Sequence, residues 1–237
     1  MQRDYHRWYS HQLGREMELL TFGHAGLPTL VFPTSMGSFH EYEDHGMVGA
    51  LAGKINAGHL RLICVSTVDA ESFYDRWAPP RARIDRYLAW ERYLLEDVVP
   101  FAGHLTGGAP LGVTGCSFGA YHALTMALRH PDLFHRCVVM GGAYDVSRFM
   151  DGHHDLDTYL LSPPQFLPGL SDPWFLERIS RNKFVFVAGE HDICRGDTER
   201  MAGTFAARGL PHSVHVWGFG SVHDWPEWRR MAQVYLP

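Results

Sequence analysis

The sequence predicts an α/β protein with a mostly parallel central sheet, helices on both faces and an N-terminal antiparallel hairpin. Short apolar runs alternate with segments of helical periodicity along most of the chain, which is typical of this class. The apolar runs are continuous, as expected of strands that are buried on both faces of a parallel sheet. The N-terminal segment instead alternates polar and apolar side chains around Gly14, which indicates a hairpin with its turn at that glycine.

The predicted elements follow one another regularly after the hairpin. Strands are expected at 29–33 and 60–67, and a helix over 47–58 lies between them. A long helix is predicted over 81–99 because apolar side chains recur there at helical spacing, and we expect Pro100 to end it. The later elements, in chain order, are strand 111–116, helix 117–129, strand 136–142, strand 183–189, helix 197–208, strand 212–218 and helix 225–236.

One domain is expected over residues 1–237, since this length is ordinary for a single domain. The segment 150–181 interrupts the alternation, because it is rich in proline and shows no clear period. In a parallel sheet the functional groups lie in loops at the carboxyl ends of the strands. We therefore predict that this segment is a cap or lid insertion over such a site.

Composition argues against several kinds of partner. The net charge is −5 without a cluster of Lys and Arg, so we expect no binding to nucleic acid or to an anionic membrane surface. No apolar stretch is long enough to span a membrane, and the N-terminus does not resemble a signal peptide. The four cysteines are scattered and form no CxxC pair, as in a cytoplasmic protein with reduced thiols. The sequence leaves a homo-oligomer open.

The stretch "VTGCSFGA", residues 113–120, carries the first candidate for chemistry. A G-x-S-x-G pattern alone is weak evidence, because glycine and serine are common. Here it follows a predicted strand and opens a predicted helix, which is the context of a nucleophile elbow, and only glycines fit beside the serine in so sharp a turn. Ser117 is the candidate nucleophile, and the amide of Phe118 is a candidate oxyanion donor. The alternative is that Ser117 simply caps the helix.

A serine hydroxyl needs a base, and position along the chain selects one among the sixteen histidines. α/β-Hydrolases place the acid and then the histidine on loops after late strands. His223 lies in such a loop before the last predicted helix, whereas His212 and His215 lie within the last predicted strand. Asp192 is the preferred acid because the strand before it must end before a carboxylate can face the histidine loop, and Glu190 is the alternative.

The loop after the first parallel strand, "PTSMGSFHEYED", is expected to give the second oxyanion donor. It contains a glycine and small residues, so its backbone amides can turn toward the site. Either Ser35 or Met36 is the expected donor. Three aromatic side chains on neighbouring loops are candidates for the pocket that holds the acyl or alcohol group, namely Tyr42, Trp77 and Tyr144.

These stretches resemble the esterase family of the α/β-hydrolase superfamily, in the branch that includes esterase D (S-formylglutathione hydrolase) and the mycolyltransferases. The matching segments span nearly the whole chain in family order: "FPTSMGSFHEYED", "VDAESFYD", "GCSFGAYHALTMALRHPDLF", "GGAYDVSRF", "VAGEHD" and "HDWPEW". The resemblance implies an α/β-hydrolase fold with Ser117 as nucleophile, Asp192 as acid and His223 as base, in agreement with the choice made from the residues. One departure is that Ser221 and Val222 replace the usual glycine pair before the histidine.

The sequence therefore predicts a serine hydrolase that cleaves small-molecule carboxylic esters through a covalent acyl-enzyme. We expect no cofactor and no metal, because the His, Asp and Glu clusters at 39–45 and 151–157 are typical of exposed polar loops. Acyl transfer to an alcohol is the alternative within the same chemistry, and it depends on how well the site excludes water. A non-catalytic binding protein on the same scaffold is the alternative from another class. A dinucleotide-binding oxidoreductase is disfavoured, because the glycine-rich stretch is not a G-x-G-x-x-G pattern.

Overall fold

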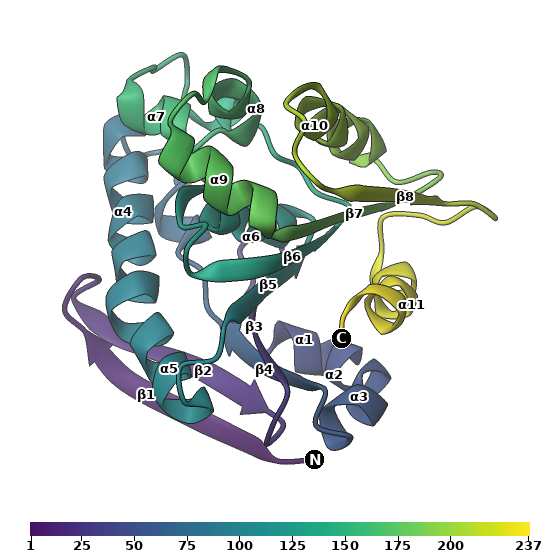
Figure 1. Cartoon of the computed structure of the whole chain (residues 1–237). Helices are drawn as coiled ribbons and strands as arrows, with labels where there is room; N and C mark the ends of the chain where they lie inside the picture. Colours follow the sequence, from purple (N-terminus) through teal and green to yellow (C-terminus); the bar gives the residue numbers. More distant parts are fainter.

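An eight-stranded sheet forms the centre of the structure (Figure 1). The computed structural model describes residues 1–237. The strand order is β1-β2-β4-β3-β5-β6-β7-β8, in which β1 and β2 are antiparallel and β3 to β8 run parallel to one another. The strands are β1 (Arg3–Ser10), β2 (Arg15–Phe22), β3 (Leu27–Phe32), β4 (Leu60–Val65), β5 (Leu111–Cys116), β6 (Phe134–Met140), β7 (Lys183–Gly189) and β8 (Ser213–Trp217). The predicted fold class is confirmed, and the N-terminal hairpin turns at Gly14.

Helices cover both faces of the sheet. One face carries α4 (Pro80–Tyr93), α5 (Val99–Thr106), α6 (Phe118–Arg129), α7 (Leu156–Leu160), α8 (Pro163–Phe166), α9 (Pro173–Arg181) and α10 (Arg195–Ala207). The other face carries α1 (Glu41–Asp44), α2 (Met47–Ala50), α3 (Ala52–Asn56) and α11 (Trp225–Tyr235). None of these helices combines the length and the hydropathy that crossing a membrane requires.

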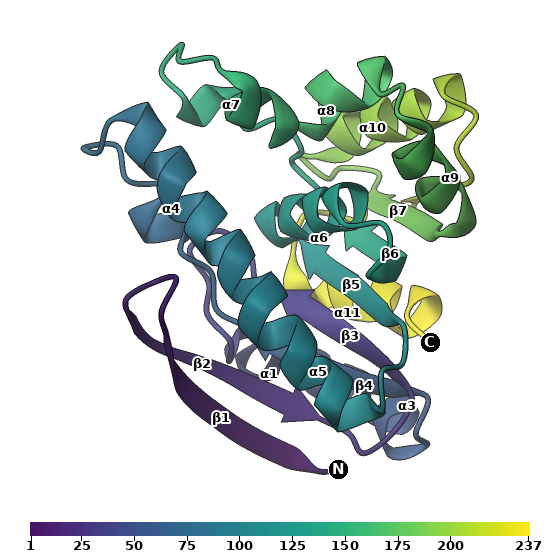
Figure 2. The same cartoon turned by 60° about the vertical axis from the view of Figure 1, so that its left-hand side comes forward.

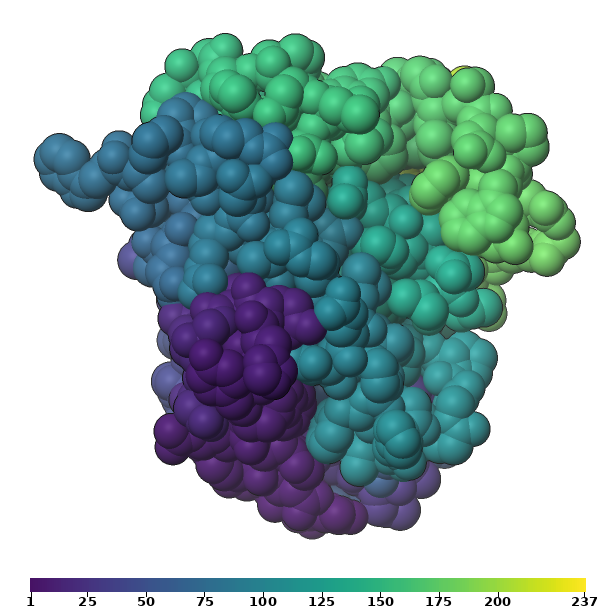
Figure 3. All heavy atoms as spheres, turned by 90° about the vertical axis from the view of Figure 1, so that its left-hand side faces the viewer, coloured from purple at the N-terminus to yellow at the C-terminus, as the bar shows by residue number.

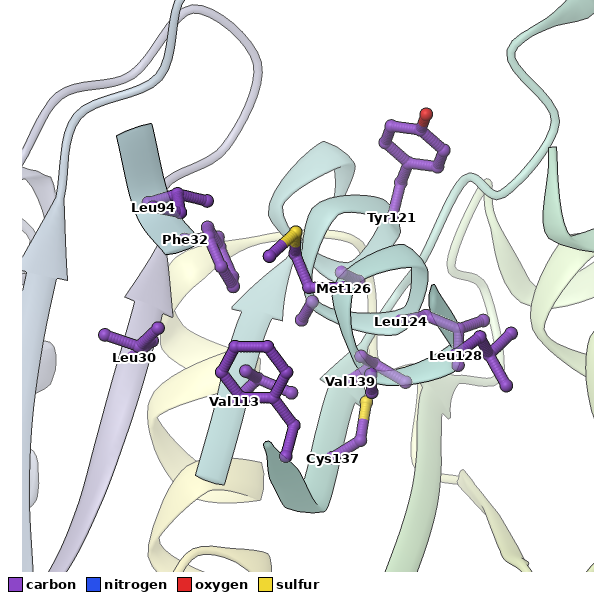
Figure 4. Close-up of a cluster of buried hydrophobic side chains, with 14 of the residues drawn as sticks. Leu30, Phe32, Leu94, Val113, Tyr121, Leu124, Met126, Leu128, Cys137 and Val139 are labelled. Carbon is purple, nitrogen blue, oxygen red and sulfur yellow. The ribbon is translucent and has the colours of Figure 1, made fainter. Parts of the chain in front are cut away.

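The central strands divide their side chains between the two faces with the two-residue period of a β-strand. Leu30, Val113 and Val139 belong to the same cluster of buried side chains as Leu124 of α6 (Figure 4). Val138, between two such positions on β6, belongs to the second cluster under α11. The continuous apolar runs of these strands are thus explained by burial on both sides, and α6 is held firmly against the strand that precedes it.

Two predicted helix boundaries are wrong. The helix expected over 47–58 breaks into α2 and α3 at Leu51, whose backbone leaves helical values (φ −94°, ψ 1°). The helix that was expected to end at Pro100 continues to Thr106 as one rod (Figure 2). A π-helical turn over Leu94–Val98 precedes the proline. This wider turn moves the preceding carbonyls away from the proline ring, which lacks an N–H, so the helix passes through without the usual clash.

The segment 150–181 forms short helices beside α6 and α4, and Figure 3 shows its surface next to that of α4. The Tyr121 hydroxyl of α6 donates a hydrogen bond to the Leu161 carbonyl at 2.9 Å. Arg81, in the first turn of α4, pairs with Asp155 at 2.9 Å and with Asp157 at 2.7 Å. These contacts attach the segment to the α6 face of the sheet. Its action as a lid stays a prediction.

A buried ion pair joins α4 to the end of α6. Glu91 is 3% exposed, and its carboxylate accepts hydrogen bonds from Arg129 at 2.9 Å and from His130 at 2.5 Å. Burial raises the pKa of Glu91, but the hydrogen bond from His130 and the charge of Arg129 outweigh burial, so the pKa lies below its ordinary value. The ionised carboxylate therefore stabilises the folded state.

Glu91→Gln is expected to lower the free energy of unfolding by about 2 kcal/mol at neutral pH, because it removes a charged acceptor from two donors. The folded-state pKa is depressed, so this contribution is present above the ordinary glutamate pKa of 4.5 and is lost as the pH falls through the lowered value. Urea denaturation of both proteins at about pH 7 and about pH 3 measures the difference. A difference that stays constant over this range would contradict the assignment.

Candidate active site

Ser117 lies in a sharp turn between β5 and α6. Its backbone has φ 55° and ψ −121°, a strained conformation for a residue with a side chain. A Cβ at Gly115 would lie 2.3 Å from the backbone of Gly119, and a Cβ at Gly119 would lie 2.3 Å from the Phe32 carbonyl oxygen. The two glycines are therefore required by the close approach of the backbone, as a nucleophile elbow demands.

The structure brings Ser117, Asp192 and His223 together from three separate loops. His223 Nε2 is 2.9 Å from Ser117 Oγ, and His223 Nδ1 is 2.7 Å from Asp192 Oδ1. The Asp192 side chain is fully buried, and the His223 side chain is 14% exposed. Because a carboxylate only accepts, Nδ1 carries the proton that faces Asp192, which leaves Nε2 to accept from the Ser117 hydroxyl. The arrangement can deprotonate the hydroxyl when an electrophile is present.

The neighbouring acids lie elsewhere. The Glu190 carboxylate accepts a hydrogen bond from the Gly220 amide at 3.3 Å, whereas the His223 ring bonds to Asp192 and Ser117. Asp224 is the N-cap of α11, where its carboxylate accepts from the Trp225 amide at 2.7 Å. Neither carboxylate competes with Asp192 for the imidazole.

Gly141 is a residue that the sequence analysis did not single out. It has φ 57°, and a Cβ there would lie 2.5 Å from Asp192 Oδ2 and 3.0 Å from His223 Nδ1. Only glycine leaves room for this pair to form beside the end of β6. The available signal was the pair of glycines, Gly141 and Gly142, directly after a predicted strand.

The turn at residues 34–37, called here the oxyanion turn, distinguishes the two candidate donors. Gly37 N donates to Thr34 O at 2.9 Å, and the backbone of Met36 is left-handed (φ 59°). The Met36 amide donates to Asp69 Oδ2 at 2.9 Å, whereas the Ser35 amide has no hydrogen-bond partner within the protein. The Ser35 amide is therefore the one that is free for a ligand. Asp69 was not singled out from the sequence, although it lies in the family-like stretch "VDAESFYD".

The three predicted pocket residues differ in their surroundings. Tyr42 is buried in the core, where its hydroxyl is 3.7 Å from Cys116 Sγ, and Tyr144 is buried with a pKa that desolvation raises well above the ordinary value. Trp77 is 98% exposed, at the surface. The position of a loop does not decide the direction of its side chains, so two of these rings are buried in the protein and the third points into solvent. Contact of the three with substrate stays a prediction.

Metal ligands are few around the site. The ligand atoms of Asp192, Cys194 and His223 lie within 4.8 Å of one another. Burial and the negative charge of Asp192 raise the pKa of the Cys194 thiol to about 12, so it is protonated at neutral pH. The other two residues already bond to each other, which favours proton transfer over metal binding at this position.

The sheet order, the strand–turn–helix at Ser117 and the loops at the strand ends define the α/β-hydrolase class. A family model described as "Putative esterase" matches residues 10–232. The chain belongs to this esterase family and is an ester-hydrolysing enzyme. A comparison of the sequence with curated proteins finds no match.

Solved structures with the same fold include several esterases and serine hydrolases. A ferulic acid esterase is 12% identical with a TM-score of 0.78, over 100% of this chain and 96% of that one. An S-formylglutathione hydrolase from Agrobacterium tumefaciens is 13% identical with a TM-score of 0.75, over 99% and 92% of the two chains. The fluorophosphonate-binding serine hydrolase FphF of Staphylococcus aureus is 16% identical with a TM-score of 0.70, over 98% and 96%. At these identities the likeness shows the fold alone.

Proposed function

We propose that the protein hydrolyses small-molecule carboxylic esters through an acyl-enzyme formed on Ser117, with His223 as base and Asp192 as the acid that orients it. The observation that carries the proposal is the unbroken hydrogen-bond chain from Ser117 Oγ through the His223 ring to Asp192 Oδ1. This order of donors and acceptors is the one that serine hydrolysis requires.

The first half of the reaction forms the acyl-enzyme. Ser117 Oγ attacks the acyl carbon while His223 Nε2 takes the hydroxyl proton, and Asp192 stabilises the resulting imidazolium. The amides of Phe118 and Ser35 donate to the oxyanion. The Phe118 amide is available because the first residue of a helix has no carbonyl partner within the helix. When the tetrahedral intermediate collapses, the alcohol leaves with the proton from His223.

The second half releases the acid. His223 takes a proton from a water molecule, and the water oxygen attacks the acyl carbon of the acyl-enzyme. The second tetrahedral intermediate collapses, Ser117 regains its proton from His223, and the carboxylic acid departs. An alcohol in place of water at this step would transfer the acyl group instead, so an acceptor alcohol belongs in the assay.

Ser117→Ala is expected to abolish labelling by a fluorophosphonate probe and to lower kcat on a p-nitrophenyl ester by about 10⁴- to 10⁶-fold, because no other group can form the acyl-enzyme. Ser180→Ala is the matched control, since this exposed serine on α9 bonds only to the Glu177 carbonyl. Folded wild-type protein that neither binds the probe covalently nor cleaves the ester would overturn the proposal. The product ratio with and without added alcohol separates hydrolysis from acyl transfer.

A further inference from the structure

A second buried carboxylate–imidazole pair lies directly behind the oxyanion turn. Asp69 is 1% exposed and His122 is fully buried, with 3.1 Å between Asp69 Oδ1 and His122 Nε2. The other carboxylate oxygen, Oδ2, accepts the hydrogen bond from the Met36 amide. The proposed reaction gives neither side chain a chemical step, although both lie close to the groups that would hold the oxyanion.

Stability alone is a weak reason for this pair. Burying charged or strongly polar groups in a core is costly, and apolar side chains of similar volume commonly serve as well or better. The surroundings of His122 are aromatic: its ring stacks on Tyr87 at 5.7 Å and meets the edge of Phe118 at 4.8 Å. A polar pair in such aromatic surroundings points to a role in positioning the atoms that it contacts.

The contact that the pair makes is with a strained residue. Met36 is the third residue of the oxyanion turn, and its φ of 59° is a conformation that favours glycine there. The Asp69 carboxylate accepts a hydrogen bond from the Met36 amide, so it stabilises the orientation of the Ser35–Met36 peptide that this conformation requires. The direction of the neighbouring Ser35 amide depends on the same turn. Removing the acceptor frees the turn to relax to a conformation that methionine adopts more easily.

The segment from Asp69 to Tyr74 also contacts Ser35, the other central residue of the oxyanion turn. The Asp69 carbonyl accepts from the Tyr74 amide at 2.9 Å, and the Tyr74 hydroxyl donates to Ser35 Oγ at 2.6 Å. Asp69 therefore fixes both central residues of the turn, one through its carboxylate and one through Tyr74.

His122 connects Asp69 and the oxyanion turn to the Phe118 amide, which is the other proposed oxyanion donor. It lies four residues after Phe118 on α6, so both residues share one face of the helix. The Asp69–His122 contact therefore links the turn that carries the Ser35 amide to the helix that carries the Phe118 amide. The two donors come from different parts of the chain, and their spacing must suit a single oxygen atom.

We propose that Asp69 and His122 are positioning residues that fix the distance and angle between the Ser35 and Phe118 amides. The inference rests on the proposed function, because it concerns how well the site stabilises an oxyanion. Neither residue touches the substrate. Their effect is therefore expected in kcat, while KM changes little.

The test compares Asp69→Ala with Glu91→Gln, which also removes a buried carboxylate, but one that bonds to Arg129 and His130 at the other end of α6 from Ser117. Asp69→Ala is expected to lower kcat on a p-nitrophenyl ester, and the rate of fluorophosphonate labelling, by about 10- to 100-fold, a part of the loss caused by removing a whole donor. Glu91→Gln is expected to leave both rates unchanged well below its melting temperature. Asp69→Ala combined with Met36→Gly is expected to recover about 5-fold or more of the lost kcat, since glycine adopts the left-handed turn without the carboxylate.

An unchanged kcat in folded Asp69→Ala would overturn the inference, and so would a loss of kcat that Met36→Gly does not reduce. A purely structural role of Asp69 predicts no rescue by glycine at position 36. Should Asp69→Ala fail to fold, His122→Asn breaks the same link, and an unchanged kcat in that variant overturns the inference equally. An inactive, unlabelled wild type overturns the proposed function itself, whereas an active wild type with unaffected variants overturns only this inference.

Discussion

His223→Ala is expected to lower kcat for ester hydrolysis by about four to six orders of magnitude while the protein stays folded. The reason is that His223 Nε2 is the only ring nitrogen within hydrogen-bond distance of Ser117 Oγ. Without it, the hydroxyl keeps its proton and is a weak nucleophile. Steady-state hydrolysis of a p-nitrophenyl ester measures the loss, and circular dichroism verifies the fold.

Matched variants separate the base and the acid from their neighbours. His191→Ala changes an exposed histidine next to Asp192 and is expected to alter kcat less than about 3-fold, since only its backbone amide bonds to the site loop. Asp192→Asn is expected to cost on the order of 10⁴ in kcat, because the amide NH2 can donate to His223 Nδ1 and so impose the wrong tautomer, and the neutral amide no longer stabilises the imidazolium. A larger loss in Glu190→Gln than in Asp192→Asn would show that the acid is misassigned.

Gly119→Ala is expected to lower the free energy of unfolding by about 3 kcal/mol and to remove activity with it. A methyl group at this position would lie 2.3 Å from the Phe32 carbonyl oxygen and 2.5 Å from that of Pro33. Both atoms belong to backbone that leads into the oxyanion turn, so neither can move without displacing that turn. Urea denaturation and the ester assay measure the two effects.

Gly203→Ala is the matched control, because this glycine also lies in a helix but a Cβ there meets nothing within 4 Å. It is expected to raise the free energy of unfolding by about 0.5–1 kcal/mol, since alanine restricts the unfolded chain and favours the helix. Equal effects of the two substitutions would contradict the steric reading of the elbow.

The sequence was sufficient where the signal is local. The strands and most helices follow from hydrophobic periodicity, which each segment carries by itself. Ser117 could be selected because the elbow pattern sits between a strand and a helix. Asp192 and His223 could be selected because they follow late strands in the order that α/β-hydrolases use. In the structure the His223 ring bonds to both Ser117 and Asp192. Their catalytic roles stay a proposal.

The remaining features depend on contacts between distant parts of the chain. The sequence left Ser35 and Met36 as alternative oxyanion donors. The Met36 amide is already bonded to Asp69, which lies 33 residues away in the chain. The burial of Tyr42 under Cys116 depends on how α1 and α11 pack on the sheet. The passage of the helix through Pro100 depends on a π-helical turn that no propensity predicts. Such features are decided by tertiary packing, and so the single sequence does not reveal them.

The position of β8 has a consequence for how the enzyme loses activity. This five-residue strand is an outer edge of the sheet, has no buried residue, and pairs with a single strand, β7. The loop that carries His223 begins where it ends. Strands of this kind open locally at a small fraction of the cost of global unfolding. His223, the proposed base, is thus attached to an edge of the sheet, whereas Ser117 lies on a central strand–helix turn. We therefore expect local opening at β8 to remove activity from a molecule whose core is still folded.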